Sequence, residues 1–286
     1  MEFKISEDMK MVRELLELTQ EELAIELKVE PLTIKRIENH NTYTSNKTLE
    51  TFYNFIYKKK IYINKIKVMF YKENMINEIL LFHGLKNGIE GSIEVSKGRS
   101  NNDFGNGFYL GETYEKAASF VENFPSSCIY YFAFNSNGLK HIKYEVNQEW
   151  MLTIAYFRGA LEKYKEHPYI KKLISKLENI DYVIAPIADN RMYRIINSFI
   201  DGEITDEQCK HCLAATNLGN QYVLLTNNAI NRLEKLECCF LSNEERNSYK
   251  ILKNEDSKIS EDKVKLARIK YRGKGHYIDE ILKWKK

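Results

Sequence analysis

The sequence predicts an α+β protein in which a small all-helical domain precedes a domain of mixed strands and helices. Two observations predict this class. Apolar residues recur at helical spacing through about the first seventy residues, and capping signals separate the successive helices. After residue 78, apolar runs short enough to be buried strands alternate with stretches of helical spacing.

The helical part carries recognisable start signals. Thr19 to Glu22 reads as a capping box that opens a helix, and a short turn at residues 28–30 separates this helix from the next. Pro31 suits the first position of that next helix, because its missing N–H has no partner there in any helix. A further helix is expected from about residue 45 to residue 57.

The segment from Leu16 to Asn39 is similar to the DNA-binding domain of the Cro and phage-repressor type, which contains a helix-turn-helix motif. The resemblance implies a contact with DNA through the polar side chains of Gln20, Thr33, Lys35 and Arg36. Two positions depart from the pattern, since the side chains of Pro31 and Leu32 cannot donate hydrogen bonds to base edges. A dimerisation or partner-docking surface is the alternative role for this domain.

A connector from about residue 61 to residue 77 is expected to be helical and to lead into the second domain without a flexible linker. The next apolar run predicts a strand that stops at His83 and Gly84, and a site would lie at the end of that strand. After a polar loop, the segment 105–110 contains two glycines that permit a sharp bend or a close approach to a ligand. Thr113 is predicted to N-cap the following helix, so that two strands could frame one cleft.

The remainder of the second domain is expected to alternate between the two kinds of element. The apolar and branched residues predict strands over 128–134, 139–144, 181–188 and 221–226. Helical spacing predicts helices over 150–157, 169–177 and 191–200.

Several segments, in this order, resemble the ADP-ribosyltransferase superfamily, in particular its branch with a His-Gly first motif and a Tyr second motif. They are residues 82–84, 97–110, 181–205 and 219–230. The resemblance spans roughly residues 79 to 235, and within the superfamily the chain looks like a bacterial family of unassigned function. It implies a split β-sandwich with flanking helices that uses NAD as substrate and needs no metal ion.

The resemblance also implies roles for single residues. Tyr109 would stack on nicotinamide, the backbone of Gly84 would approach the carboxamide, and His83 would hydrogen-bond a ribose hydroxyl. The implied set that binds NAD is His83, Gly84, Asp103, Gly107, Phe108 and Tyr109. The implied catalytic set is His83, Tyr109 and Gln221.

Gln221 stands where many transferases carry a glutamate that stabilises cationic character on the sugar. Its amide can accept a hydrogen bond from a hydroxyl, but it forfeits a Coulomb attraction of about 1 to 4 kcal/mol at a separation of ~4 Å. Asp103 and Asp189 are candidates to restore the negative charge. Both also have a purely structural interpretation, as an Asx-turn residue and a helix N-cap respectively.

Composition narrows the class of protein further. The formal net charge is only +3, so bulk charge does not demand a nucleic-acid partner. No apolar run is long enough to span a membrane and the first ten residues are too charged for a signal peptide, so we expect a cytoplasmic protein. Cys209 and Cys212 have half of a zinc-like spacing without a second pair, and we expect them one turn apart on a helix that Thr205 and Gln208 open as a capping box.

The expected organisation is residues 1–76 as the helix-turn-helix domain with its connector, 77–241 as the transferase-like domain and 242–286 as a charged extension. From about residue 263 the extension is basic, with aromatic side chains between the lysines and arginines. That mixture suits nucleic acid, and it equally suits an exposed amphipathic helix and tail.

The sequence thus predicts a toxin-like or defence-related enzyme that transfers ADP-ribose from NAD to a macromolecule and carries a DNA-binding regulatory domain. A neutralising partner protein is an additional expectation. Two other functions remain open at this point. In one, an inactive domain senses NAD or ADP-ribose and controls transcription, and in the other the chain is a nucleic-acid-binding scaffold.

Overall fold

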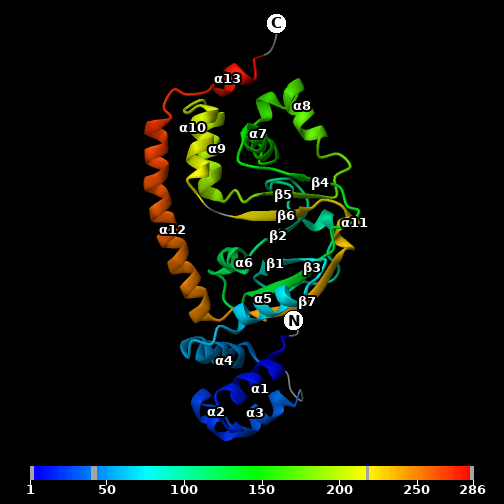
Figure 1. Cartoon of the computed structure of the whole chain (residues 1–286), viewed down its shortest axis with the longest axis vertical. Coiled ribbons are helices and arrows are strands. Elements are labelled where there is room, and N and C mark those ends of the chain that lie inside the picture. Colours follow the sequence, from blue (N-terminus) through cyan, green and yellow to red (C-terminus); the bar gives the residue numbers. More distant parts are fainter. Residues whose placement is uncertain (1–2, 40–43, 217–218, 284–286) are drawn as a thin grey trace. The chain divides into compact units, whose positions relative to one another are not determined.

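The computed structural model describes residues 3–39, 44–216 and 219–283, and the chain forms two compact units (Figure 1). The first unit contains the described residues of Met1–Gly91, Thr113–Asn135 and Glu234–Lys253. The second contains the described residues of Ser92–Glu112, Ser136–Leu233 and Asn254–Lys286. Helices dominate the start of the chain and strands mix with helices after it, so the predicted α+β class is confirmed.

The first unit begins with helices α1 (Ile5–Leu15), α2 (Gln20–Leu27), α3 (Pro31–Glu38), α4 (Asn46–Lys58) and α5 (Ile63–Asn74). The local signals in the sequence set their starts. Thr19 and Glu22 form the predicted capping box at α2, and Pro31 occupies the first turn of α3. The expected helix after residue 45 and the helical connector are also confirmed, as α4 and α5.

These helices enclose a core whose fully buried members include Met9, Leu23, Ile34 and Phe52. Phe240, which comes from the end of a strand far along the chain, belongs to the same core. Its ring stacks on Tyr53 of α4 with centroids 5.5 Å apart. The helical core is therefore completed by a residue outside the helices.

Strands β1 (Ile79–Leu85), β3 (Cys128–Phe134) and β7 (Leu233–Phe240) follow one another in that spatial order, and α6 (Tyr114–Val121) packs on β1. The expectation that the first strand stops at His83 and Gly84 is wrong. Both residues lie within β1, because the antiparallel pairing with β3 continues through His83 opposite Tyr130 and Gly84 opposite Ile129. Thr113 caps α6 as predicted.

A buried charge cluster joins the helices of this unit to β7. The ammonium of Lys67 on α5 donates to Asp8 Oδ2 on α1 at 2.7 Å and to Glu237 on β7. The hydroxyl of Tyr53 donates to the same Asp8 oxygen at 2.6 Å. Asp8 and Glu237 are almost fully buried, so the hydrogen bonds from these donors offset the free-energy cost of burying their charges.

The second unit contains strands β2 (Phe108–Gly111), β4 (His141–Lys143), β5 (Tyr182–Pro186) and β6 (Asn220–Leu224). Its helices are α7 (Gln148–Phe157), α8 (Pro168–Ser175), α9 (Asn190–Ile200), α10 (Asp206–Ala214), α11 (Asn227–Ile230) and α13 (Ile278–Ile281), with short 3-10 turns at Val95–Lys97 and Glu162–Tyr164. The strand expected over 139–144 is shorter than predicted, whereas the other predicted elements of this unit are confirmed with small shifts at their ends.

The strands of the second unit lie in the order β4-β5-β6-β2. Strand β4 runs parallel to β5, and β6 is antiparallel to both β5 and β2. Val183, Ala185 and Val223 belong to one apolar core together with buried residues of α7 and α9, such as Trp150 and Ile196. Alternation along the strands therefore directs one face of this sheet toward the helices (Figure 1).

Helix α12 (Asn243–Lys270) begins in the first unit and ends in the second. It covers most of the segment that the sequence marks as charged, and the helix expected from about residue 263 is confirmed for residues 263–270. The last residues of the predicted basic tail, Trp284, Lys285 and Lys286, lie outside the described residues.

Cys209 and Cys212 lie one turn apart on α10, whose N-cap is Thr205, and both side chains are buried in the core. Burial raises the pKa of both thiols. Among the residues that the structure describes, no three His, Cys, Asp or Glu side chains are grouped so that they could hold a metal ion. None of the described helices is both long and apolar enough to cross a membrane.

Glu245, near the start of α12, is a buried carboxyl without a cation in hydrogen-bond contact among the described residues. The hydroxyl of Tyr114 donates to Oε1 at 2.9 Å, and the amide of Asn64 donates to Oε2 at 2.9 Å. Burial raises the pKa of Glu245 to about 7, although both hydrogen bonds oppose that shift. The folded unit therefore binds this proton more tightly than the unfolded chain does.

We expect stability to fall as the pH rises from about 4.5, the ordinary pKa of a glutamate, to about 7. The loss assigned to Glu245 over this window is about 3 kcal/mol in the free energy of unfolding. Glu245→Gln should remove that part of the pH dependence, because an amide does not titrate. Urea unfolding of the wild type and the variant at several pH values, followed by circular dichroism, measures the difference.

Glu255→Gln is the matched control, since Glu255 is exposed on the same helix and should leave the slope unchanged. If Glu245→Gln and the wild type lose stability equally between these pH values, Glu245 is ionised in the folded unit and the assignment fails.

Candidate functional site

Asp103 is the centre of the candidate site in the second unit. Its carboxylate is 4% exposed and accepts hydrogen bonds from three parts of the chain. The guanidinium of Arg158 approaches Oδ1 at 2.8 and 2.5 Å, and the backbone N–H of Ala188 donates to Oδ2 at 3.3 Å. The side-chain amide of Gln221 also donates to Oδ2, at 2.7 Å. A buried carboxylate thus gathers the end of α7, the segment after β5 and strand β6 at one point.

The guanidinium of Arg158 contacts three different groups. Besides its ion pair with Asp103, it donates to the carbonyl of Ala188 at 2.6 Å, and its guanidinium lies 4.5 Å from the ring centre of Tyr193 on α9. The sequence did not indicate Arg158 as a site residue. The one available signal was its position directly after the apolar helix α7, because an arginine in a mostly buried setting needs a carboxylate partner.

Gln221 lies on β6 with its amide orientation set by two acceptors. Nε2 donates to Asp103 and, at 3.3 Å, to the backbone carbonyl of Pro186. Both amide hydrogens are then used, and no described residue donates to the remaining atom, Oε1. The site therefore presents one fixed amide oxygen as an acceptor.

Tyr109 lies on the same face of the sheet as Gln221. It pairs with Val223, and side chains two residues apart on a strand point to the same side. Its hydroxyl accepts from the N–H of Phe104 at 3.0 Å and donates to the carbonyl of Gly105 at 2.8 Å. Burial raises the pKa of Tyr109, so the phenol stays protonated and keeps donating. Its hydroxyl shapes the preceding loop, and the half-buried Tyr109 packs in part against the apolar core of the second unit.

The glycines around Tyr109 are required by packing. Gly105 has a φ of +71°, which confirms the predicted bend, and a Cβ there would come within 2.9 Å of Phe157. At Gly107 a Cβ would meet the side chain of Val223 at 2.9 Å and the carbonyl of Leu224 at 3.1 Å. The neighbouring Phe108 is half-buried in β2. Since packing alone demands glycine at both positions, these residues add no separate evidence for a ligand.

His83 and Gly84 belong to the first unit, so the structure brings together only the Asp103, Tyr109 and Gln221 part of the predicted site within one unit. His83 is half-buried on β1, opposite Tyr130 of β3. A Cβ at Gly84 would lie 2.5 Å from the carbonyl of Ala117 on α6, so glycine is needed there for the close contact of helix and strand.

Asp189 is the N-cap of α9. Its carboxylate oxygen Oδ1 accepts from the N–H groups of Arg191 and Met192, each at 2.9 Å. The structural interpretation of this residue is confirmed.

The four residues predicted to contact DNA lie on α2 and α3 in the first unit. Lys35 and Arg36 are exposed on α3, and Thr33 is half-buried. The amide of Gln20, at the start of α2, donates to Glu38 Oε2 at 2.7 Å, which ties the two helices together.

Comparison with known proteins assigns the central part of the chain. A family model described as "Protein of unknown function (DUF3990)" matches residues 79–235, which is more than half of the sequence. The chain belongs to the DUF3990 family. The DUF3990 region contains every residue of the candidate site, whereas α1 to α5 and all of α12 lie outside it. No curated protein and no solved structure matches the chain.

The ion pair in this DUF3990 site should carry a measurable part of the stability of the second unit. Asp103→Asn leaves the guanidinium of Arg158 mostly buried without its charge partner, and we expect a loss of about 3 kcal/mol in the free energy of unfolding. Replacing both residues, as Asp103→Asn with Arg158→Met, should cost less than the two single changes together. Fluorescence of the buried Trp150, in a Trp284→Phe background, reports unfolding of this unit. Additive losses would show that the pair is not coupled.

Proposed function

We propose that the protein binds NAD and transfers its ADP-ribose group to a macromolecule, as a toxin-like or defence-related enzyme. The observation that carries the proposal is that Tyr109 and Gln221 lie on one face of the sheet, with Gln221 Oε1 left as an acceptor because Nε2 donates to Asp103. The order of motifs in the sequence, which resembles the ADP-ribosyltransferase superfamily, supports the same function.

In the proposed reaction the bond between the nicotinamide nitrogen and C1 of its ribose breaks, and nicotinamide leaves with the electron pair as a neutral molecule. The acceptor forms a bond to the same carbon and loses a proton to solvent. The sugar carries cationic character at the transition state, so the site must orient the leaving group and hold the hydroxyls of the ribose. The ring of Tyr109 suits the first task and Gln221 Oε1 suits the second.

His83 and Gly84 enter the proposal through the resemblance alone. They would hydrogen-bond the ribose and approach the carboxamide of nicotinamide, respectively. Asp103 has a different role from the one that its charge suggests. Because Arg158 neutralises it, Asp103 acts on the ligand through the orientation of Gln221 and not as a free carboxylate.

A specific observation favours a second candidate function. Among the described residues, the only carboxylate bonded to Gln221 is already paired with an arginine, so Asp103 offers no unpaired negative charge to a cationic transition state. A site of this kind would bind NAD or ADP-ribose without turnover. In that case the domain would be a nucleotide sensor that controls transcription through the helical domain.

Binding is tested first, by titrating NAD into the protein in a calorimeter. Tyr109→Ala should reduce the affinity for NAD at least tenfold, since it removes the stacking surface. Tyr109→Phe keeps the ring and loses only the hydrogen bonds to the loop at residues 104–105, so it should retain most of the affinity. If the wild type and Tyr109→Ala bind NAD equally, or if neither binds, the site is misplaced.

Release of nicotinamide then separates enzyme from sensor. If the wild type is an enzyme, Gln221→Ala should reduce the rate by the equivalent of about 2 to 4 kcal/mol, while the affinity for NAD falls much less. Gln221→Glu should keep or raise the rate. If the wild type is a sensor, only Gln221→Glu should release nicotinamide above background. Asp189→Asn is the control, because that carboxylate caps α9.

We also propose that the helical domain binds duplex DNA. The supporting observation is the exposed outer side of α3, where Lys35 and Arg36 have no ion pair among the described residues, next to a short turn from α2. The alternative, a docking surface for a partner protein, is favoured by Leu32, whose side chain is 53% exposed on the same helix.

Affinity for duplex DNA, including the region upstream of the protein's own gene, should depend steeply on salt. Arg36→Ala should weaken binding and lower the slope of log affinity against log salt by about one, because one phosphate contact is lost. Fluorescence anisotropy across a salt series measures both quantities. Lys250→Ala, which removes an exposed positive charge on α12, should leave the slope unchanged. Absence of binding to every duplex at low salt would favour the docking alternative.

A further inference from the structure

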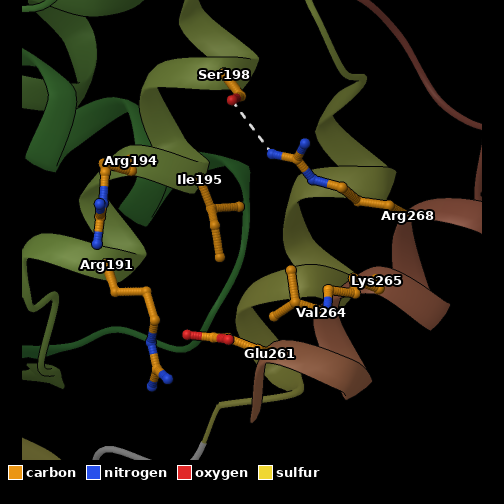
Figure 2. Close-up of a pocket in the computed structure, with 8 residues that line it drawn as sticks. All are labelled: Arg191, Arg194, Ile195, Ser198, Glu261, Val264, Lys265 and Arg268. Carbon is orange, nitrogen blue, oxygen red and sulfur yellow. Dashed lines mark hydrogen bonds between the residues drawn. The ribbon is translucent and has the colours of Figure 1, made fainter. Parts of the chain in front are cut away.

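The second unit contains a pocket of about 330 Å³ between α9 and the end of α12 (Figure 2). Its lining is Arg191, Arg194, Ile195, Ser198, Glu261, Val264, Lys265 and Arg268. None of these residues takes part in the Asp103 site, so the pocket is a separate feature. Its volume lies at the lower end of the range for sites that bind small molecules.

One face of each helix builds the pocket. The residues from α9 are spaced at i, i+3, i+4 and i+7 from Arg191, and those from α12 have the same spacing from Glu261. Two contacts join the helices at this point. The guanidinium of Arg268 donates to Ser198 Oγ at 3.3 Å (Figure 2), and Arg191 donates to the backbone and hydroxyl oxygens of Ser257 at 3.1 and 2.9 Å.

The charges of the lining are unbalanced. Three arginines and one lysine face a single carboxylate, Glu261, which is exposed and makes no ion pair with any described residue. Lys265 pairs only with Asp262 at 3.3 Å, and both of these side chains are largely exposed, so that pair is weak. Positive charges gathered in one pocket repel each other, and an anion bound between them would relieve the repulsion.

Donors in the pocket also lack acceptors. The Nε of Arg191 is buried and has no hydrogen-bond partner among the described residues, although such a group costs free energy when left unpaired. Arg268 has five N–H groups, and its partners are Ser198 Oγ and the thiol of Cys212. The planar fork of an arginine side chain matches the oxygens of a phosphate, as it does those of a carboxylate.

We propose that this pocket binds a ligand with two or more phosphate groups. Four cations from two helix faces exceed what one phosphate needs, and Ile195 with Val264 supplies an apolar wall for an organic part of the ligand. A free nucleoside diphosphate and the backbone of a nucleic-acid strand both carry this chemistry. The proposal is independent of the NAD proposal, because the two sites share no residue.

The test is a set of calorimetric titrations at low ionic strength with three probes: pyrophosphate, ADP and a short single-stranded oligonucleotide. At least one probe should bind, and Arg191→Gln should weaken that binding about tenfold or more. Arg194→Gln and Lys265→Gln should weaken it as well, and these two side chains are exposed, so their loss should not disturb folding. Preference for ADP or for the oligonucleotide identifies the source of the phosphates.

Two further variants test the direction of the charge effect and provide a control. Glu261→Gln removes the one negative charge of the pocket and should tighten binding, an effect that damage to the fold would not produce. Arg272→Gln removes an exposed arginine beyond the end of α12 and should change the affinity less than twofold. Tyr109→Ala should not change it, which separates this pocket from the proposed NAD site.

The proposal is overturned if none of the three probes binds at low ionic strength. It is equally overturned if Arg272→Gln weakens binding as much as Arg191→Gln, since the attraction would then be a property of the whole surface. Binding that Glu261→Gln fails to strengthen also contradicts it.

Discussion

The second unit depends on the buried charge of Asp103. A carboxylate that is 4% exposed is stable only if donors surround it, and the chain supplies them from Arg158, Ala188 and Gln221. Strand pairing already brings the segment after β5 beside β6, and α7 and α9 share one core, so these donors come from segments that packing places near one another. The carboxylate of Asp103 adds hydrogen bonds that tie β6, the end of α7 and the segment before α9 together. The hydrogen bond to Asp103 also sets the orientation of the Gln221 amide.

Local signals in the sequence predicted much of the fold. Thr19, Pro31, Thr113 and Asp189 lie at helix starts as expected, because capping is an interaction between neighbours in the chain. The predictions were wrong or incomplete where contacts between residues far apart in the sequence determine the structure. Strand β1 extends beyond its apolar run because β3 continues to pair with it. Arg158 was missed because its partner lies 55 residues away, and a single sequence carries no sign of that distance.

The glycines illustrate how one pattern supports two explanations. Gly84, Gly105 and Gly107 stand beside the residues that resemble an NAD site, yet each has a neighbour so close that a Cβ would collide with it. Tight packing alone explains glycine at these positions, so the glycines do not indicate a bound ligand. The case for the proposed NAD site accordingly rests on a polar atom with an unused hydrogen-bonding position, Gln221 Oε1, and not on the glycines.

The helices at the start of the chain do not form a complete core on their own. Phe240 follows the DUF3990 match by five residues and belongs to the same buried core as residues of α1 to α4. Cutting the chain after α5 would leave a hole the size of a phenyl ring, and loss of such a ring from a core costs about 3 to 5 kcal/mol. Recombination that exchanged the first seventy residues for those of another protein would meet the same penalty. The helical core and the strand that supplies Phe240 therefore stabilise each other.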